Sequence, residues 1–289
     1  MATELTDDLA ARLDRVPGLA GVPRTISELP GGLTNRNYKV TTPDGVYVAR
    51  LWSGGGDFLA INRDYEHHNS VAAAQAGVGA RVVAYRPEDN LLVLEFIEGR
   101  TFSDADVQNP ANIPRIAQAC RRLHSGPRFL GDFDMFVIQG RYAAVTAELG
   151  FRVPAGYDAL MPQVESARRA LAVRAGPTVP CNNDLLAANF IDDGVRLWLI
   201  DYEYSGNNDP CFELGNIWGE SGLSGEAWPA WSPATTAARC GTRLPAPSCL
   251  ASSASTAGPC GGRSRPQPAR SSSTSGPGRW PATRAQLRA

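Results

Sequence analysis

Lysine is almost missing from this sequence of 289 residues: Lys39 is the only one, and arginine supplies nearly all the other positive charge. The formal net charge is −1 at pH 7, and no basic stripe runs along any segment. Nucleic-acid binding needs such a concentration of positive charge. We therefore expect no nucleic-acid partner.

Long apolar runs are also missing, and the six cysteines include no Cys-x-x-Cys pair. A membrane-spanning helix needs about 20 mostly apolar residues. The N-terminal segment is acidic and amphipathic, without the basic and then apolar pattern of a secretory leader. These absences predict a cytoplasmic protein without membrane insertion, and the cysteine spacing argues against a disulfide framework.

The first third of the chain has the pattern of a small antiparallel sheet with one helix. Apolar residues alternate around Tyr38 to Thr41 and in "VYVARLW", on either side of a turn at Pro43 to Gly45. An alanine-rich helical segment closes at Gly77, and a hairpin turns at Pro87 to Asn90. We expect residues 1–98 to form this lobe.

Helical patterns dominate from residue 99 onward, for example in "DALMPQVESARRALAV". Two short strands, "FIDD" and "RLWLID", interrupt them around a turn at Asp193 and Gly194, and a helix is expected to begin after Pro210. The whole pattern predicts an α+β fold, with a small antiparallel-sheet N-lobe and a mostly helical C-lobe over residues 99–223.

Three oxygen-bearing side chains stand out in the stretch from Val179 to Pro210, namely Asp184, Asn189 and Asp201. Each alone would fit a polar hairpin. However, Asp184 and Asn189 have the Asp-x-x-x-x-Asn spacing of a kinase catalytic loop, and Asp201 follows an apolar strand as the metal-binding Asp of such enzymes does. Carboxylate and amide oxygens suit Mg²⁺. Together they favour a phosphoryl-transfer site.

The N-terminal half carries residues suited to the phosphates of a nucleotide. Glycines let backbone N–H groups approach phosphates closely, and nearby polar side chains add donors. The residues of this kind are Gly31, Gly32, Thr34 and Asn35. Arg50 on the next strand and Glu66 on the next helix match the cation and carboxylate pair that fixes nucleotide phosphates in kinases. Each feature alone would be an ordinary turn or ion pair.

In this order the motifs resemble the choline and ethanolamine kinases, within the aminoglycoside-phosphotransferase-like group of protein-kinase-like folds. The resemblance covers about residues 29–220, in segments that include "GGLTNRNY", "YVARLW", "INRDYEHHN", "LEFIEGRTF", "NNDLLAANF" and "LIDYEYSGNNDPCFELGN". It implies a two-lobed protein-kinase-like fold, ATP and Mg²⁺ as cofactors, and an amino alcohol as substrate.

The resemblance also implies roles for the matched residues of the catalytic and metal loops. Asp184 looks like the base that accepts the proton of the alcohol. Asn189 and Asp201 look like the Mg²⁺ ligands, and Glu203 supports the metal shell. These loops are expected to do the chemistry.

Further roles follow for residues outside those loops. Leu94 to Ile97 resembles the hinge whose backbone, at Glu95 and Ile97, binds adenine. Glu220 aligns with an acidic residue that faces the cationic nitrogen of the substrate, although an exposed helix-end glutamate is the plain alternative. Arg50 is a family trait, because an arginine commonly replaces the lysine of protein kinases there.

The sequence departs from the family at Asn182, where choline kinases usually have the histidine of His-Asn-Asp-Leu. That histidine supports the catalytic and metal loops by hydrogen bonding, and an asparagine is expected to keep one of those bonds. The substitution predicts a weakened enzyme rather than an inactive one.

The composition changes abruptly after Ser224. Glu226 is the last acidic residue, and Ile, Val, Phe and Tyr no longer occur. Residues 224–289 fit a disordered low-complexity tail. A frameshift is the rival hypothesis, because shifted codons permit Tyr-Gly-Trp-Thr-Leu-Trp-Gly in place of "STAGPCG", and two other segments permit aromatic sequences in the order that the family has them. The gene sequence would decide between the two.

We therefore expect an ATP-dependent small-molecule kinase that phosphorylates choline or a related amino alcohol. An aminoglycoside or another small alcohol remains open as the substrate. A catalytically impaired nucleotide-binding pseudokinase is the alternative from another class, and a purely structural module would require the ordered motifs to be coincidental.

Overall fold

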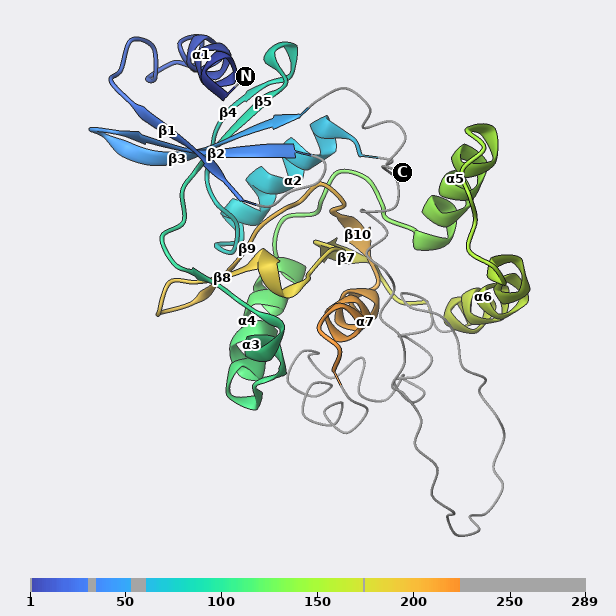
Figure 1. Cartoon of the computed structure of the whole chain (residues 1–289). Coiled ribbons are helices and arrows are strands. Elements are labelled where there is room, and N and C mark those ends of the chain that lie inside the picture. The colour runs from blue at the N-terminus through green and yellow to red at the C-terminus, as the bar shows by residue number, and fades with distance from the viewer. Residues whose placement is uncertain (1, 31–34, 53–60, 174, 224–289) are drawn as a thin grey trace, which may run out of the picture.

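The computed structural model describes residues 2–30, 35–52, 61–173 and 175–223, and these form two lobes (Figure 1). The smaller lobe is built on a sheet and the larger one is mostly helical, so the predicted α+β organisation is confirmed. Residues 224–289, and with them the frameshift hypothesis, lie outside the described part of the chain.

Five antiparallel strands form the sheet of the smaller lobe, in the order β1-β2-β3-β5-β4. Their bounds are Thr25–Leu29 (β1), Asn35–Thr42 (β2), Gly45–Trp52 (β3), Val82–Arg86 (β4) and Leu91–Glu95 (β5). β2 and β3 pair along their whole length, and Thr42 lies opposite Gly45, so the turn predicted there is a two-residue hairpin connection. In this register Arg50 lies opposite Asn37.

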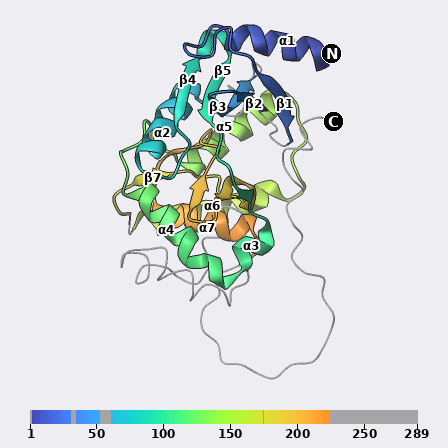
Figure 2. The same ribbon diagram turned by 90° about the vertical axis from the view of Figure 1, so that its left-hand side faces the viewer.

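Two helices flank this sheet, and they belong to different hydrophobic cores (Figures 1 and 2). α1 (Ala2–Leu13) buries Leu9 and Leu13 in a cluster with residues of the sheet. α2 (Arg63–Gln75) begins after Asn62, whose side chain accepts a hydrogen bond from the Tyr65 N–H. It lies between the sheet and the larger lobe, and its Ala72 and Ala73 are buried in the core of that lobe.

The larger lobe packs around a second core that includes Ile116, Leu123, Phe190, Leu199 and Ile217. Its helices are α3 (Asp104–Gln108), α4 (Ile113–His124), α5 (Met135–Glu148), α6 (Tyr157–Ala172) and α7 (Pro210–Glu220). Its strands are β6 (Arg100–Thr101), β7 (Val179–Cys181), β8 (Phe190–Asp192), β9 (Leu197–Leu199) and β10 (Gly206–Asn208). The two strands and the helix predicted from "FIDD" to "CFELGNIWGE" are thus present as β8, β9 and α7.

The helices α5 and α6 stand at the side of the larger lobe (Figure 1). Neither contains a buried residue, although both carry apolar side chains. Val137 is 54% exposed and Val173, just beyond α6, is 81% exposed. This helical pair therefore contributes little to the core that supports the loops of the larger lobe.

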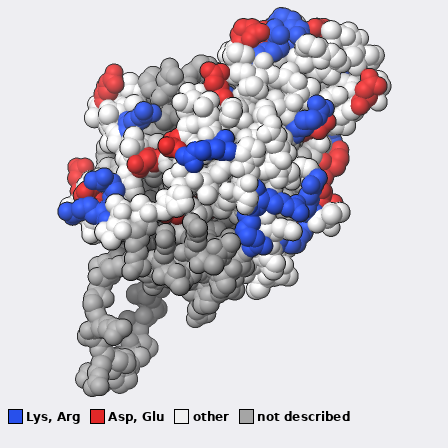
Figure 3. Space-filling model, turned by 180° about the vertical axis from the view of Figure 1, so that it is seen from behind, with Lys and Arg blue, Asp and Glu red and all other residues white. Residues whose placement is uncertain are grey.

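Figure 3 shows the face seen from behind, where uncharged residues cover most of the described surface. Several basic side chains gather at the lower right of this view, with acidic side chains beside them, and elsewhere the two charges lie in small mixed groups. No helix within the described ranges is both long and apolar enough to cross a bilayer.

Candidate active site

The segment from Asn182 to Asn189 leaves β7 and forms a closed loop that presents Asp184. Asn183 has a left-handed backbone, with φ of 66°, and its side chain donates a hydrogen bond to the Tyr204 carbonyl at 3.1 Å. Asparagine tolerates this conformation better than most residues. The Asn189 side chain donates to the carbonyl of Asp184 at 2.7 Å. The predicted Asp-x-x-x-x-Asn spacing therefore lets one residue close the loop on the other.

Asp201 follows β9 at the start of a second loop beside the first. The Ile200 N–H donates to the Asn189 carbonyl at 3.0 Å, which joins the two loops. Asp201 also has a left-handed backbone, with φ of 64°. An uncommon backbone conformation of this kind persists only where surrounding contacts hold it, and such residues gather at functional sites.

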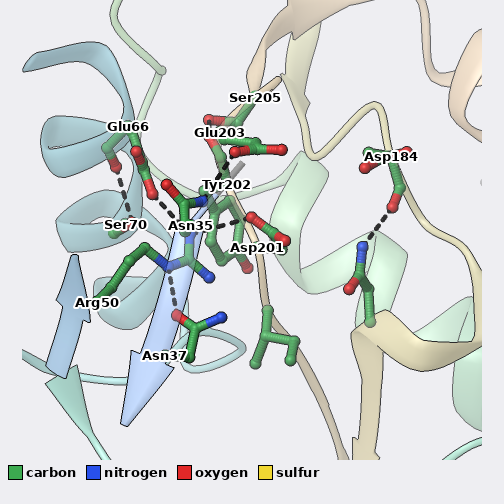
Figure 4. Close-up of polar contacts among 12 residues, drawn as sticks. Asn35, Asn37, Arg50, Glu66, Ser70, Asp184, Asp201, Tyr202, Glu203 and Ser205 are labelled. Carbon is green, nitrogen blue, oxygen red and sulfur yellow. Dashed lines mark hydrogen bonds and ion pairs between the residues drawn. The ribbon is translucent and has the colours of Figure 1, made fainter. Parts of the chain in front are cut away.

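Arg50 connects the two lobes through a buried set of charges (Figure 4). Its Nη1 lies 2.6 Å from Glu66 Oε1 and 3.0 Å from Asp201 Oδ1, and its Nε donates to Asn37 Oδ1 at 3.2 Å. Burial alone would lower the pKa of the Arg50 guanidinium, but the charges of Asp201 and Glu66 outweigh burial and raise this pKa. The arginine is therefore permanently charged. The structure brings Arg50 and Glu66 together as the sequence predicts.

Sequence reasoning missed Arg63, which lies in the same network. Its Nη1 donates to Glu66 Oε2 at 2.6 Å and lies 3.9 Å from Glu203 Oε2. Glu203 is buried and accepts a hydrogen bond from the Asn35 side chain at 3.0 Å. The only sequence signal for Arg63 was its position three residues before Glu66 on a helix, which places both on one face.

The oxygen donors beside this network suit a small hard cation. Asn189 uses its side-chain nitrogen to bond Asp184, which leaves its carboxamide oxygen for a metal, and Arg50 contacts only one carboxylate oxygen of Asp201. Carboxylate and amide oxygens are the ligands that Mg²⁺ takes in phosphoryl-transfer sites. The donor set at Asn189 and Asp201, with Glu203 buried nearby, therefore fits Mg²⁺.

The predicted hinge connects β5 to the larger lobe. The N–H groups of Glu95 and Phe96 donate to the carbonyls of Arg81 and Val46, each at 2.9 Å, so sheet bonds fix this segment. A cavity of about 260 Å³ adjoins it, with Glu95, Phe96, Ile97 and Trp198 in its lining. The hinge is thus hydrogen-bonded to neighbouring strands and borders a cavity that Phe96 and Trp198 help to line.

Other predicted site residues lie elsewhere. Glu220 is the last residue of α7 and is exposed, and it is not part of the network that Figure 4 draws. Gly31, Gly32 and Thr34 lie outside the described residues, so only Asn35 of the predicted phosphate-binding group has a described position.

A buried polar cluster beside Asn182 and Asn183 was also missed. Glu213 on α7 is fully buried, and its Oε1 accepts the N–H groups of Asn182 at 2.5 Å and Asn183 at 3.3 Å. Its other oxygen contacts His124 Nε2 on α4. Burial and this carboxylate raise the pKa of the Cys181 thiol well above its usual range, so Cys181 stays protonated. A glutamate within a helix gives no sequence signal for such a role.

Asn182 makes more contacts than the sequence predicts. Its side-chain nitrogen donates to the carbonyls of Ile200 at 3.1 Å and Asp201 at 3.0 Å, and its oxygen accepts the Asp184 N–H at 3.1 Å. The sequence led us to expect at least one bond from this side chain to the neighbouring loops, and the structure shows three. An amide carries both donors and an acceptor, and here its place between two loops uses all of them.

Comparison with known proteins places these features in a family. The phosphotransferase enzyme family matches residues 25–251 of the sequence. This chain belongs to the phosphotransferase enzyme family. Among solved structures, a choline/ethanolamine kinase family protein from Mesorhizobium loti is 32% identical, with a TM-score of 0.68 over 80% of this chain and 76% of that one. The resemblance to choline and ethanolamine kinases that the motifs predicted is confirmed.

Other matches to known proteins are less similar in sequence, and one of them is a solved structure with a similar fold. Choline kinase LicA from Streptococcus pneumoniae is 24% identical, with a TM-score of 0.70 over 81% of each chain. The LicA protein of Haemophilus influenzae is 27% identical over 204 residues, or 68% of this chain and 58% of that protein. A probable ethanolamine kinase of Arabidopsis thaliana is 25% identical over 215 residues, or 68% and 56%. The chain thus spans less than two thirds of the length of the last two relatives.

Proposed function

We propose that this chain is an ATP- and Mg²⁺-dependent kinase that transfers the γ-phosphoryl group to the hydroxyl of choline or a related amino alcohol. The observation that carries the proposal is the buried network in which Arg50 contacts both Glu66 and Asp201. In kinases a cation held by a helix carboxylate fixes the nucleotide phosphates beside the metal-binding Asp. The same three chemical groups meet here in a chain of the phosphotransferase family.

In the proposed reaction Asp184 is the base. Its carboxylate takes the proton of the substrate hydroxyl while the hydroxyl oxygen forms a bond to the γ-phosphorus. The bond from that phosphorus to the bridging oxygen breaks, and ADP leaves with its electron pair. Phosphoryl transfer needs little more from a protein than positioning and charge. The hydrogen bond from Asn189 to the Asp184 carbonyl supports this role because it fixes the loop on which the base stands.

Asn189 and Asp201 are the proposed metal-binding residues, with Glu203 behind them. Bound Mg²⁺ supplies positive charge that the β- and γ-phosphate oxygens need during transfer. Arg50 carries out a related task without a metal, because its guanidinium remains charged beside Asp201. Arg63 holds Glu66 and lies near Glu203, so it steadies both carboxylates.

ATP is proposed to bind between an N-lobe of residues 1–98 and a C-lobe of residues 99–223. Adenine would contact the backbone of Glu95 and Ile97. The cavity that these two residues help to line extends towards Asp193 and Trp198, not towards Arg50 and Asp201, so it does not itself mark the adenine position. Gly31, Gly32, Thr34 and Asn35 are the proposed phosphate donors. One structural relative is LicA in complex with AMP, which is 24% identical with a TM-score of 0.67.

Glu220 is the proposed contact for the cationic nitrogen of the substrate. The support is its acidic charge and its exposed position at the end of α7. Ethanolamine and choline both carry a positive nitrogen near the hydroxyl, and both appear in the names of relatives. An exposed carboxylate suits either one.

A substrate panel tests the proposal. The purified chain is incubated with labelled ATP and Mg²⁺ in the presence of choline, ethanolamine or an aminoglycoside, and the labelled product is identified. Transfer to choline or ethanolamine is expected. Transfer to the aminoglycoside alone would reject the amino-alcohol substrate, and nucleotide binding without any transfer would favour a pseudokinase.

A further inference from the structure

The only lysine of the chain, Lys39, lies on β2 at the side of the sheet that carries the Arg50 side chain. Two residues before it on the same strand is Asn37, which accepts a hydrogen bond from Arg50 (Figure 4). Alternate residues of a strand point to the same side of a sheet. This side faces the larger lobe, because Arg50 contacts Asp201 there.

The neighbours of Lys39 along and across the sheet agree with this orientation. Tyr38 and Val40, on either side of it in sequence, are buried in the hydrophobic cluster that includes α1. Across the sheet, Lys39 lies opposite Val48 on β3, which in turn lies opposite Leu94 on β5. The predicted hinge begins at Leu94. Lys39 is therefore placed near the point where the sheet passes into the hinge.

Both side-chain contacts of Lys39 are made with the hinge segment. Its Nζ lies 4.0 Å from the centre of the Phe96 ring and donates a hydrogen bond to Glu98 Oε1 at 3.4 Å. Phe96 stands between Glu95 and Ile97, whose backbone is the proposed contact for adenine. The ammonium of the one lysine thus lies beside the proposed position of the base.

The ammonium of Lys39 keeps donors that a ligand can use. A lysine carries three N–H donors, and within the described ranges Glu98 is the one hydrogen-bond partner of Lys39. The Glu98 side chain is 76% exposed and that of Lys39 is 31% exposed, so a ligand can reach this pair. Exposed ion pairs of this kind stabilise a fold little. The two contacts therefore orient the ammonium without occupying all of its donors.

Two cations on this side of the sheet lie at opposite ends of the proposed nucleotide site. Arg50 contacts Asp201, where the metal and the phosphates are proposed to bind, and Lys39 contacts the hinge. Val48, opposite Lys39, is two residues from Arg50 on β3, which is about 7 Å along the strand. A nucleoside offers ring nitrogens and ribose oxygens as acceptors, and a charged donor makes stronger hydrogen bonds to such atoms than a neutral one does.

We infer that Lys39 is a further nucleotide-binding residue, whose ammonium contacts the nucleoside of ATP at the hinge end of the site. This inference rests on the part of the proposed function that places ATP between the lobes, and it does not require phosphoryl transfer. It also places the one lysine amine of the chain within reach of the ribose. Chemical labelling of that amine can therefore test it without any measurement of activity.

Periodate-oxidised ATP, which has aldehydes in place of the ribose hydroxyls, is the labelling reagent. The Lys39 nitrogen adds to an aldehyde carbon, water leaves, and borohydride reduces the carbon–nitrogen double bond to a stable secondary amine. Peptide mapping by mass spectrometry should find the label on Lys39, and excess ATP should reduce it by about fivefold or more, because the two compete for one site. The N-terminal amine is the internal control, since ATP should leave its labelling unchanged.

Calorimetric titration of substituted chains with ATP and with inorganic triphosphate separates the two ends of the site. Lys39→Met should weaken ATP binding by about five- to tenfold, because one charged hydrogen bond is lost, and triphosphate binding by less than about twofold. Lys39→Arg keeps the charge and should retain most of the affinity for ATP. Arg36→Met is the matched control: Arg36 is also on β2, lies over the Tyr38 ring and pairs with exposed Glu28, but on the opposite side of the sheet.

The outcomes distinguish this inference from the proposed reaction. If ATP does not protect Lys39 from the label, or if Lys39→Met weakens ATP binding no more than Arg36→Met does, Lys39 does not bind the nucleoside. An equal loss of triphosphate binding in Lys39→Met would also refute the inference, because the substitution would then disturb the whole site. Protection of Lys39 by ATP in a chain that transfers no phosphate would support the inference and overturn the kinase reaction alone.

Discussion

The guanidinium of Arg50 on β3 lies 3.0 Å from the carboxylate of Asp201 in the larger lobe, and the same nitrogen lies 2.6 Å from Glu66 on α2. One buried cation thus contacts acids from two other segments, and the side chains of Arg50 and Glu66 are only 8% and 2% exposed. Removing one partner of such a set leaves an uncompensated buried charge, which is costly. The network is therefore expected to respond strongly to small changes in geometry.

Arg50→Lys should raise the KM for ATP by about tenfold or more, because an ammonium cannot contact Glu66, Asp201 and Asn37 together as the planar guanidinium does. The KM for ATP is measured by steady-state kinetics in which ATP is varied and choline is kept at a saturating concentration. Arg36→Lys on β2 is the control, since Arg36 makes an exposed ion pair with Glu28. Equal effects of the two substitutions would contradict the role of the Arg50 network.

Asp184→Asn should lower kcat by about 10² to 10⁴-fold, the usual contribution of a positioned general base. Affinity for ATP and Mg²⁺ should persist, because Arg50, Glu66 and Asp201 are untouched. Titration with a fluorescent ATP analogue separates the two effects. Asp132→Asn serves as the control, because its carboxylate is 71% exposed. If the Asp184→Asn variant keeps the kcat of the unaltered chain, Asp184 is not the general base.

Glu220→Gln should raise the KM for choline by about fivefold, since an exposed carboxylate contributes at most about 1 kcal/mol to a cation. The KM for ATP should not change. The matched control is Glu165→Gln on α6, another exposed helical glutamate. If Glu220→Gln leaves the KM for choline unaltered, the cation contact lies elsewhere.

The carboxylate of Asp89 is expected to stabilise the folded chain in a pH-dependent way. Hydrogen bonds from Arg15 and Arg86 lower its pKa from 3.8 to about 2. The pKa of Asp89 is lower in the folded chain than in the unfolded chain. Its contribution to the free energy of unfolding is therefore complete above about pH 4 and is lost as the pH falls through about 2. Asp89→Asn should therefore lower the thermal unfolding midpoint at pH 5, and the difference from the unaltered chain should shrink towards pH 2.

Glu28→Gln provides the comparison for Asp89, because the Glu28 side chain is 52% exposed. It should change the unfolding midpoint little at either pH. A difference between Asp89→Asn and the unaltered chain that stays constant from pH 5 to pH 2 would show that the carboxylate charge is not the cause.

A disordered tail and a shifted reading frame make different predictions for residues 224–289, and the frameshift hypothesis is the one tested here. Restoring the other frame should introduce aromatic residues and lower the KM for choline, since aromatic faces attract a quaternary ammonium by about 0.5 to 2 kcal/mol per contact. Gene sequencing checks the frame, and kinetics of the restored chain checks the effect. Codons incompatible with the aromatic reading would reject the hypothesis.

The sequence predicted the parts of this structure that depend on local patterns. The hairpin between β2 and β3 follows from alternation around a Pro-Asp-Gly turn, and β8 and β9 follow from short apolar runs around Asp193 and Gly194. The meeting of Arg50 with Glu66 was also predicted, from the order of a strand and a helix. Periodicity and turn residues are visible along a chain without knowledge of its partners.

The contacts that were missed join residues far apart in sequence. Glu213 binds backbone groups of Asn182 and Asn183, some 30 positions away. Nothing in the pattern of α7 distinguishes such a glutamate from a solvated one. The contacts of Asn182 were underestimated for a related reason: the number of bonds that an amide makes depends on which backbone groups the fold places around it.

The helix α2 contacts both lobes, and this limits how the lobes can move relative to each other. Its Ala72 and Ala73 pack in the core of the larger lobe, while its Glu66 grips Arg50 in the sheet. Rotation of the smaller lobe away from the larger one would pull these alanines out of a close-packed interior. The helix is also bound to the sheet, because Asp64 accepts a hydrogen bond from Tyr85 on β4 and His67 stacks on the same ring. The helix α2 therefore couples the sheet to the core of the larger lobe, and the two are expected to move together at this contact.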